Sequence, residues 1–234
     1  MAAHETGIAT LPPLGELRTR TVTDQIFDVL YERVVDLTLP PGAKLSEAEV
    51  AAQMGVSRQP VRDAFFRLSQ TGFIQIRPQR ATTVTPLSEE AVLRAHFIRT
   101  ALEEACVRVA AERLNEASLA ALDVLVERQA EAVAAGDRSA FHALDDDFHR
   151  DICAFAGLDF VWALVKENKG HMDRARYLSL SYGSDTALAE HRVIMKALRA
   201  RDPEAAADAI REHLGRIREI IARVRIEQPS VFAG

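Results

Sequence analysis

Four residues in the C-terminal two thirds of the chain have the types and spacing of a divalent-metal site. Asp145 and His149 stand four positions apart on a segment with helical periodicity, so their side chains would be neighbours on one helix face. His191 lies ten residues before a turn at Arg201 and His213 twelve residues after it, so an antiparallel helix pair would place both at nearly one level. A carboxylate and three imidazoles between helices can bind Zn²⁺, Ni²⁺ or Co²⁺, and Mn²⁺ less well.

Spacing alone leaves other arrangements open. Asp146 stands three positions from His149 and could pair with it. His142, His171 and Cys153 carry atoms that can also bind metals. A histidine beside an apolar face is more often a hydrogen-bonded core residue than a ligand. From spacing, the metal site is therefore a hypothesis.

A second group of residues has chemistry suited to DNA. Residues 57–80 contain five arginines and one acid, although the formal net charge of the chain is −5. Arg58 and Arg62 share a helix face, and an arginine can form two hydrogen bonds to guanine. The side chains expected to reach base edges are Ser57, Arg58, Gln59, Pro60 and Arg62, and the tip at residues 77–80 would reach an adjacent groove or the backbone. The alternative is a solvated arginine-rich face on an unrelated helical domain.

The elements around these arginines predict a winged helix-turn-helix over residues 19–86. Three helices and a β-hairpin wing are expected, with helix starts at Val22, Ser46 and Ser57 and strands at 73–76 and 82–85. Pro40 would end the first helix, and Gly55 would supply the turn between the other two. In this motif the N-terminal residues of the last helix reach base edges in the major groove.

Residues 87–228 read as helix throughout. Caps and turns predict an all-α antiparallel bundle of six helices, or seven if the first one breaks, so the whole protein is expected to be mainly α. Residues 1–18 are expected to be a disordered tail, and residues 229–234 a second tail.

The composition fits a cytoplasmic protein. A length of 234 residues suits two modest domains, and 48% hydrophobic residues can form a packed core. The two cysteines have no metal-type spacing, which fits a reducing compartment. No apolar run approaches the roughly 20 residues of a membrane helix, and the N-terminus has no signal-peptide pattern. We expect no membrane partner.

The first part of the chain resembles the winged helix of the GntR family of transcriptional regulators. The resemblance covers about residues 20–86 and rests on PPGAKLSE at residues 40–47 and GVSRQPVRDA at residues 55–64. It implies a homodimer that binds a palindromic operator in double-stranded DNA.

The DNA contacts of that family correspond to residues at the start of the third helix and in the wing, namely Arg58, Gln59, Pro60, Arg62 and Arg80. Two positions depart from the family pattern. Ala48 stands where some members carry a DNA-contacting arginine, and Ala81 stands where the wing usually has glycine. These departures concern the operator sequence rather than DNA binding itself.

The second part resembles the FCD domain, the ligand domain of FadR-type members. A D-x-x-F-H motif falls at residues 145–149, an R-x-x-L-E motif at 99–103, and later motifs at 190–191 and 213–214. The resemblance covers most of residues 88–220. It implies that the metal ligands are Asp145, His149, His191 and His213.

In metal-binding members a small organic acid commonly sits on the ion. Arg99 is then expected to grip the carboxylate of that effector, unless it pairs with Glu103. Leu158 departs from the family, which often has asparagine there, and this concerns only a turn.

The sequence therefore predicts a repressor or activator whose operator affinity depends on a small carboxylate at a divalent-metal site. A regulator that senses the metal itself is the alternative. A metal-dependent hydrolase is a remote one, because the sequence has no HExxH, GxSxG or P-loop motif. We expect the protein not to be an enzyme.

Overall fold

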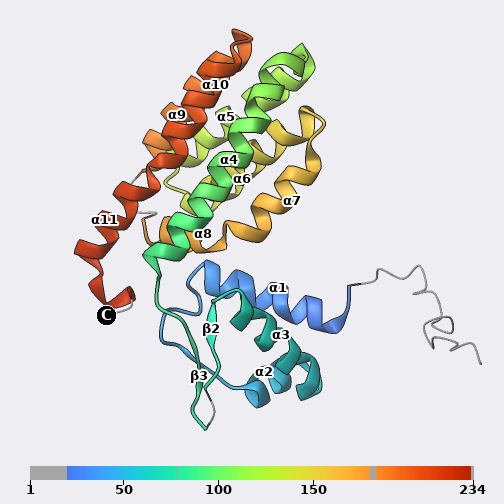
Figure 1. Ribbon diagram of the computed structural model, residues 1–234, viewed down its shortest axis with the longest axis vertical. Coiled ribbons are helices and arrows are strands. Elements are labelled where there is room, and N and C mark those ends of the chain that lie inside the picture. Colours follow the sequence, from blue (N-terminus) through green and yellow to red (C-terminus); the bar gives the residue numbers. More distant parts are fainter. Residues whose placement is uncertain (1–19, 78, 180–182, 233–234) are drawn as a thin grey trace, which may run out of the picture.

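Two domains, each with its own apolar core, make up the structure, a computed structural model that describes residues 20–77, 79–179 and 183–232 (Figure 1). The tail predicted for residues 1–18 lies outside these ranges. Within them, no helix is long and apolar enough to cross a membrane.

The N-terminal domain is the expected winged helix-turn-helix. Its elements are α1 (Val22–Val35), β1 (Lys44–Leu45), α2 (Glu47–Met54), α3 (Arg58–Gln70), β2 (Ile74–Gln75) and β3 (Thr82–Val84). The strand β3 pairs antiparallel with both β1 and β2, so the sheet order is β1-β3-β2. The sequence predicted the β2–β3 hairpin but not β1, because a two-residue strand has no alternation to detect.

Burial of one face of α3 decides which side chains face outwards. The buried residues of this helix are Val61, Ala64, Phe65 and Leu68. Gly55, in the left-handed region at φ 65°, turns the chain from α2 into α3. Ser57 begins α3 as expected, but its side chain makes no capping hydrogen bond. Arg58 and Arg62 remain exposed on the face opposite the core.

The C-terminal domain is the expected all-α bundle, with more helices than predicted. Its described part contains α4 (Glu89–Arg113), α5 (Glu116–Ala134), α6 (Arg138–Phe155), α7 (Asp159–Asn168), α8 (Gly170–Leu178), α9 (Ser184–Arg199), α10 (Pro203–Gly215) and α11 (Ile217–Glu227). We expected six or seven helices and the structure has these eight. The breaks at Lys169 and Arg216 keep right-handed helical angles, so they bend the chain without interrupting its helical periodicity.

Residues 229–232, predicted as part of a tail, belong to the fold. Pro229–Val231 forms a 3-10 turn, and the Leu87 N–H donates to the Val231 carbonyl at 2.7 Å. Phe232 is 8% exposed and joins the apolar core of the bundle. The sequence did not predict this order, because the segment has no periodicity and is ordered by the burial of one aromatic ring.

The two domains meet where α8 packs on α1. Gly170, the first residue of α8, lies so close to the N-terminal domain that a Cβ there would stand 2.2 Å from Tyr31 Oη and 2.8 Å from Phe73 Cζ. Only glycine allows this approach without moving one of the two aromatic side chains.

We therefore expect Gly170→Ala to loosen the contact between the domains. The overlap should lower stability by about 1–3 kcal/mol, as overpacking does elsewhere. Gly215→Ala is the matched control, because a Cβ at Gly215 would meet nothing within 4 Å. Thermal unfolding and proteolysis of the two variants provide the measurement. Equal behaviour of both variants would contradict a tight contact at Gly170.

Candidate functional site

The structure brings together the four predicted metal ligands. Asp145 and His149 come from α6, His191 from α9 and His213 from α10, and all four are buried. One possible ligand atom of each lies within 4.8 Å of the others. His149 Nε2 lies 3.2 Å from His213 Nε2, and His191 Nε2 lies 3.5 Å from Asp145 Oδ1. Two nitrogens bound to one Zn²⁺ at about 2.1 Å are separated by a similar distance.

Each imidazole has an oxygen atom at its other nitrogen. The contacts are His191 Nδ1 to Gln129 Oε1 (2.7 Å), His213 Nδ1 to Glu190 Oε2 (2.9 Å) and His149 Nδ1 to Glu103 Oε2 (2.5 Å). The Gln129 amide is itself oriented, because its Nε2 donates to the Leu144 carbonyl at 3.0 Å. A hydrogen-bond acceptor at Nδ1 favours the proton there, so we infer that Nε2 of His191 and of His213 keeps its lone pair.

Unsatisfied atoms provide a test of whether a cation fits. His191 Nε2 and Asp145 Oδ1 are buried and have no hydrogen-bond partner among the described residues. A buried polar group without a partner costs about 1–3 kcal/mol. A divalent ion between these atoms would satisfy both, and their donor types suit Zn²⁺, Ni²⁺, Co²⁺ or Mn²⁺.

The alternative ligands considered from the sequence lie elsewhere. The carboxylate of Asp146 contacts Lys169 Nζ at 2.7 and 2.9 Å. His142 stacks on an aromatic ring outside the cluster, and His171 lies at the contact between the domains. Cys153 packs in a separate apolar cluster.

The electrostatics of the cluster favour metal-binding protonation states. Burial alone would raise the pKa of Asp145, but Arg176, whose Nη2 donates to Oδ2 at 2.6 Å, and the three histidines hold it well below its usual range. Burial lowers the pKa of His191 far below its ordinary value and lowers that of His213. At neutral pH the carboxylate is therefore ionised, and these two imidazoles are neutral.

Arg99 forms the pair with Glu103 that the sequence left open. It is 1% exposed, and its Nε donates to Glu103 Oε1 at 2.5 Å. Its Nη2 is buried and has no hydrogen-bond partner in the described part of the chain. Arg99 and His149 hold the pKa of Glu103 at about 2, although burial opposes this shift. The pair with Glu103 thus leaves one guanidinium nitrogen available.

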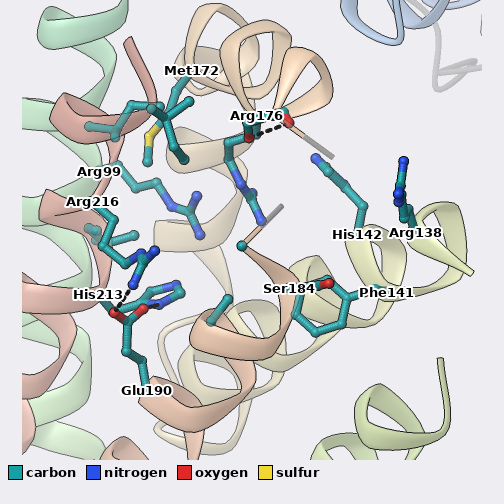
Figure 2. A pocket seen from close by; sticks show the side chains of 16 residues that line it. Arg99, Arg138, Phe141, His142, Met172, Arg176, Ser184, Glu190, His213 and Arg216 are labelled. Atoms are coloured by element: carbon teal, nitrogen blue, oxygen red, sulfur yellow. Dashed lines mark hydrogen bonds and ion pairs between the residues drawn. The ribbon is translucent and has the colours of Figure 1, made fainter. Parts of the chain in front are cut away.

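A cavity of about 90 Å³ opens beside the cluster (Figure 2). The charged residues of its wall are Arg99, Arg138, Arg176, Arg216 and Glu190. His213 also lines it, so a molecule in the cavity would lie next to a proposed metal ligand.

Helix α8 carries a charged network on the side of the cluster. Arg176 contacts Asp145, and its Nη1 lies 3.6 Å from Asp173 Oδ1. Lys169 Nζ lies 2.5 Å from Asp173 Oδ2 and 2.7 Å from Asp146 Oδ2. Arg176 of α8 and Lys169 in the bend before it therefore contact carboxylates of α6, and Asp173 contacts both of these cations.

The same helix contacts the N-terminal domain. The His171 ring stacks on Phe73 with centroids 4.2 Å apart, and its Nε2 donates to the Thr71 carbonyl at 2.8 Å. The fully buried Arg174 donates to the Thr85 carbonyl at 2.8 Å. A short helix thus touches both the candidate site and the segments that flank the wing.

The predicted DNA-facing residues belong to the start of α3 and to the wing, and the wing extends away from the bundle (Figure 1). Ser57, Arg58, Gln59, Arg62 and Arg80 are exposed and Pro60 is half-buried. Arg62 Nε lies 3.3 Å from Glu47 Oε2, and Gln59 Nε2 donates to Asp63 Oδ1 at 2.8 Å. Exposed contacts of this kind are weak, so both side chains can exchange them for DNA.

Sequence reasoning missed the residues that orient the ligands. Gln129 interrupts the buried stripe of α5, and a polar residue in such a stripe is a signal that could have been used. Glu190 was noted only as part of a motif. Arg176 gave no signal, because no periodicity distinguished it from solvent-exposed arginines.

Comparisons with known proteins agree with both domains. Residues 22–84 match the family of bacterial regulatory proteins called gntR, and residues 95–216 match the FCD domain. The HTH-type transcriptional repressor RspR of Escherichia coli K12 is 36% identical over 217 residues, which cover 92% of this chain and 95% of that protein.

Solved structures share the fold. McbR/YncC of E. coli has a TM-score of 0.72 at 24% identity, covering 87% of this chain and 98% of that one. A GntR regulator described as putative, from Rhodococcus sp. RHA1, has a TM-score of 0.69 at 22% identity, covering 86% and 97%. At these identities the likeness concerns architecture alone.

The buried histidines make a prediction about acid stability. Because the folded-state pKa values of His191 and His213 lie below the ordinary 6.5, the unfolded chain takes up their protons first as the pH falls through 6.5. The melting temperature of chelated protein should therefore fall between about pH 7.5 and pH 5.5.

A double variant, His191→Gln with His213→Gln, shows how much these two imidazoles contribute to the pH dependence. It is measured in the same chelator as the unaltered chain. Its melting temperature should depend less on pH than that of the unaltered chain. The same slope in both proteins would show that these rings are not held neutral by the fold.

Proposed function

The chain belongs to the GntR family of bacterial regulatory proteins with an FCD domain, and on that premise we propose that a small carboxylate bound at a divalent-metal site controls its affinity for operator DNA. The family makes it a DNA-binding transcriptional regulator and not an enzyme. The observation that carries the proposal is the convergence of four buried ligand atoms beside an arginine-lined cavity. Since RspR is named a repressor, we propose repression as the mode of action.

Asp145, His149, His191 and His213 would hold the ion. Zn²⁺ or Ni²⁺ suits a site of three imidazoles and one carboxylate best, and Co²⁺ or Mn²⁺ can also bind such a site. When bound, the ion supplies a positive centre to which a carboxylate oxygen can coordinate. The chain's own part is to keep His191 and His213 neutral, to orient the three imidazoles and to keep bulk water out.

Arg99 would hold the effector. Its unpartnered Nη2 is buried next to the cavity, where a low dielectric strengthens a contact with an anion. His213 lies in the same wall, so one carboxylate can lie near both the ion and the guanidinium. A small acid is favoured over a bulky one because the cavity measures about 90 Å³.

DNA binding would use the exposed start of α3 and the wing, with contacts from Ser57, Arg58, Gln59, Pro60, Arg62 and Arg80. A homodimer would place two such surfaces on a palindromic operator, as paired half-sites require. Helix α8 would couple the two domains. An effector that changes the Arg176–Asp145 contact can bias how α8 packs on the wing segments, provided that it binds one arrangement better.

Loss of one arginine at the start of α3 should weaken operator binding. Arg58→Ala or Arg62→Ala removes a contact worth about 1–3 kcal/mol, or roughly 5- to 150-fold in affinity. Arg128→Ala, an exposed arginine on α5, is the matched control and should bind normally. The measurement is fluorescence anisotropy with promoter DNA of the protein's own gene. Full affinity in both α3 variants would refute this surface.

The purified protein should bind up to one divalent ion per chain, and chelation should lower its melting temperature. His213→Ala should weaken binding of both metal and acid. Arg99→Lys keeps the charge beside Glu103 but loses the guanidinium fork, so it should weaken the acid and spare the metal. Elemental analysis measures the bound metal, and calorimetric titration with succinate measures the affinity for the acid. If metal alone changes operator affinity and no acid does, the protein is a metal sensor instead.

A further inference from the structure

We propose that the effector is a compact acid with two anionic groups, one at the metal and Arg99 and the other held at the opposite end of the cavity by Arg138 and His142. The inference rests on the proposed function, because it takes the cavity beside the metal cluster as the effector site. It adds a second recognition point.

The two ends of the cavity are distinct in Figure 2. Arg99 and His213 lie at one end, and His142 and Arg138 lie at the other, with Arg176 between them. Apolar side chains make up much of the remaining wall: Phe141, Met172, Ala187, Leu214, Ile217 and Ile220. This lining suits a short hydrocarbon spacer with a polar group at each end.

Unpartnered buried atoms occur at both ends. Arg99 Nη2 at one end and His142 Nε2 at the other lack a hydrogen-bond partner among the described residues. His142 is 6% exposed, and its ring is held by stacking on Tyr177 with centroids 4.5 Å apart. A buried ring nitrogen that is held in place in a cavity wall and has no partner is available for a hydrogen bond to a ligand.

Arg138 and the start of α9 add to the second end. Arg138, the first residue of α6, is exposed at the cavity, and no ion pair joins it to an acid of the described chain. Gly183 has no side chain to cap α9, and Gly183 and Ser184 both line the cavity. The first amide groups of α9 can therefore donate to an anion together with Arg138.

The charge around the cavity favours two negative groups over one. Four arginines face one acid, Glu190, in the wall. Asp145 and Glu103 pair with Arg176 and Arg99, which leaves a single positive charge in excess. A divalent ion would raise the excess to three. The neighbouring group of Asp146, Asp173 and Lys169 carries one net negative charge and lowers the excess to two, which a dianion would balance.

The test compares acids that differ only in the second anionic group. Metal-loaded protein is titrated with three diacids (malonate, succinate and glutarate) and, for comparison, with three monoacids (propionate, butyrate and valerate). Titration with phosphoglycolate tests whether the second anionic group is a phosphate. We expect the best dianion to bind about tenfold or more tightly than its matched monoacid. Arg138→Ala and His142→Phe should remove most of that preference while sparing the monoacid. Arg128→Ala is the control.

The outcomes separate this inference from the function it rests on. Equal, metal-dependent affinity for a diacid and its matched monoacid overturns the two-ended site and leaves the proposed function in place. Equal loss of both acids in Arg138→Ala also overturns it, because Arg138 would then not read the second group. Binding that survives chelation, or no binding by any acid, overturns the proposed function and this inference together.

Discussion

The orientation of three imidazoles is the constraint on which the rest of the structure depends. Acceptors on α4, α5 and α9 face the Nδ1 atoms, so the Nε2 atoms share one small volume with the carboxylate of Asp145. Without an ion, His191 Nε2 and Asp145 Oδ1 are buried polar atoms with no hydrogen-bond partner among the described residues, which is costly in a core. The centre of the bundle therefore contains unpartnered ligand atoms to which a cation could bind.

Helix α8 gives this cluster a reach beyond the bundle. Its Arg176 holds Asp145 on one side, while Arg174 and His171 hold backbone carbonyls of the winged helix on the other. We propose that a shift at the cavity reaches the winged helix through these contacts of α8. The contact between the domains is closely packed at Gly170. A closely packed contact can convert a local shift into a movement of one domain relative to the other.

Much of the site could be predicted from the sequence, because it depends on periodicity. The four-residue spacing of Asp145 and His149, and the level shared by His191 and His213 across a turn, follow from helix geometry alone. The partners of those residues could not be predicted, because Gln129 and Glu190 meet the cluster only through packing between helices. Periodicity also missed the bends at Lys169 and Arg216, the strand β1 and the ordered Phe232.

The central claim is that one ion is bound by these three imidazoles and one carboxylate. X-ray absorption at the edge of the bound metal measures it most directly. The account predicts outer-shell scattering from three imidazole rings, nitrogen and oxygen nearest neighbours, and a change in the oxygen shell when the effector acid is added. Scattering from fewer than three rings, or a sulfur neighbour from Cys106 or Cys153, would contradict it.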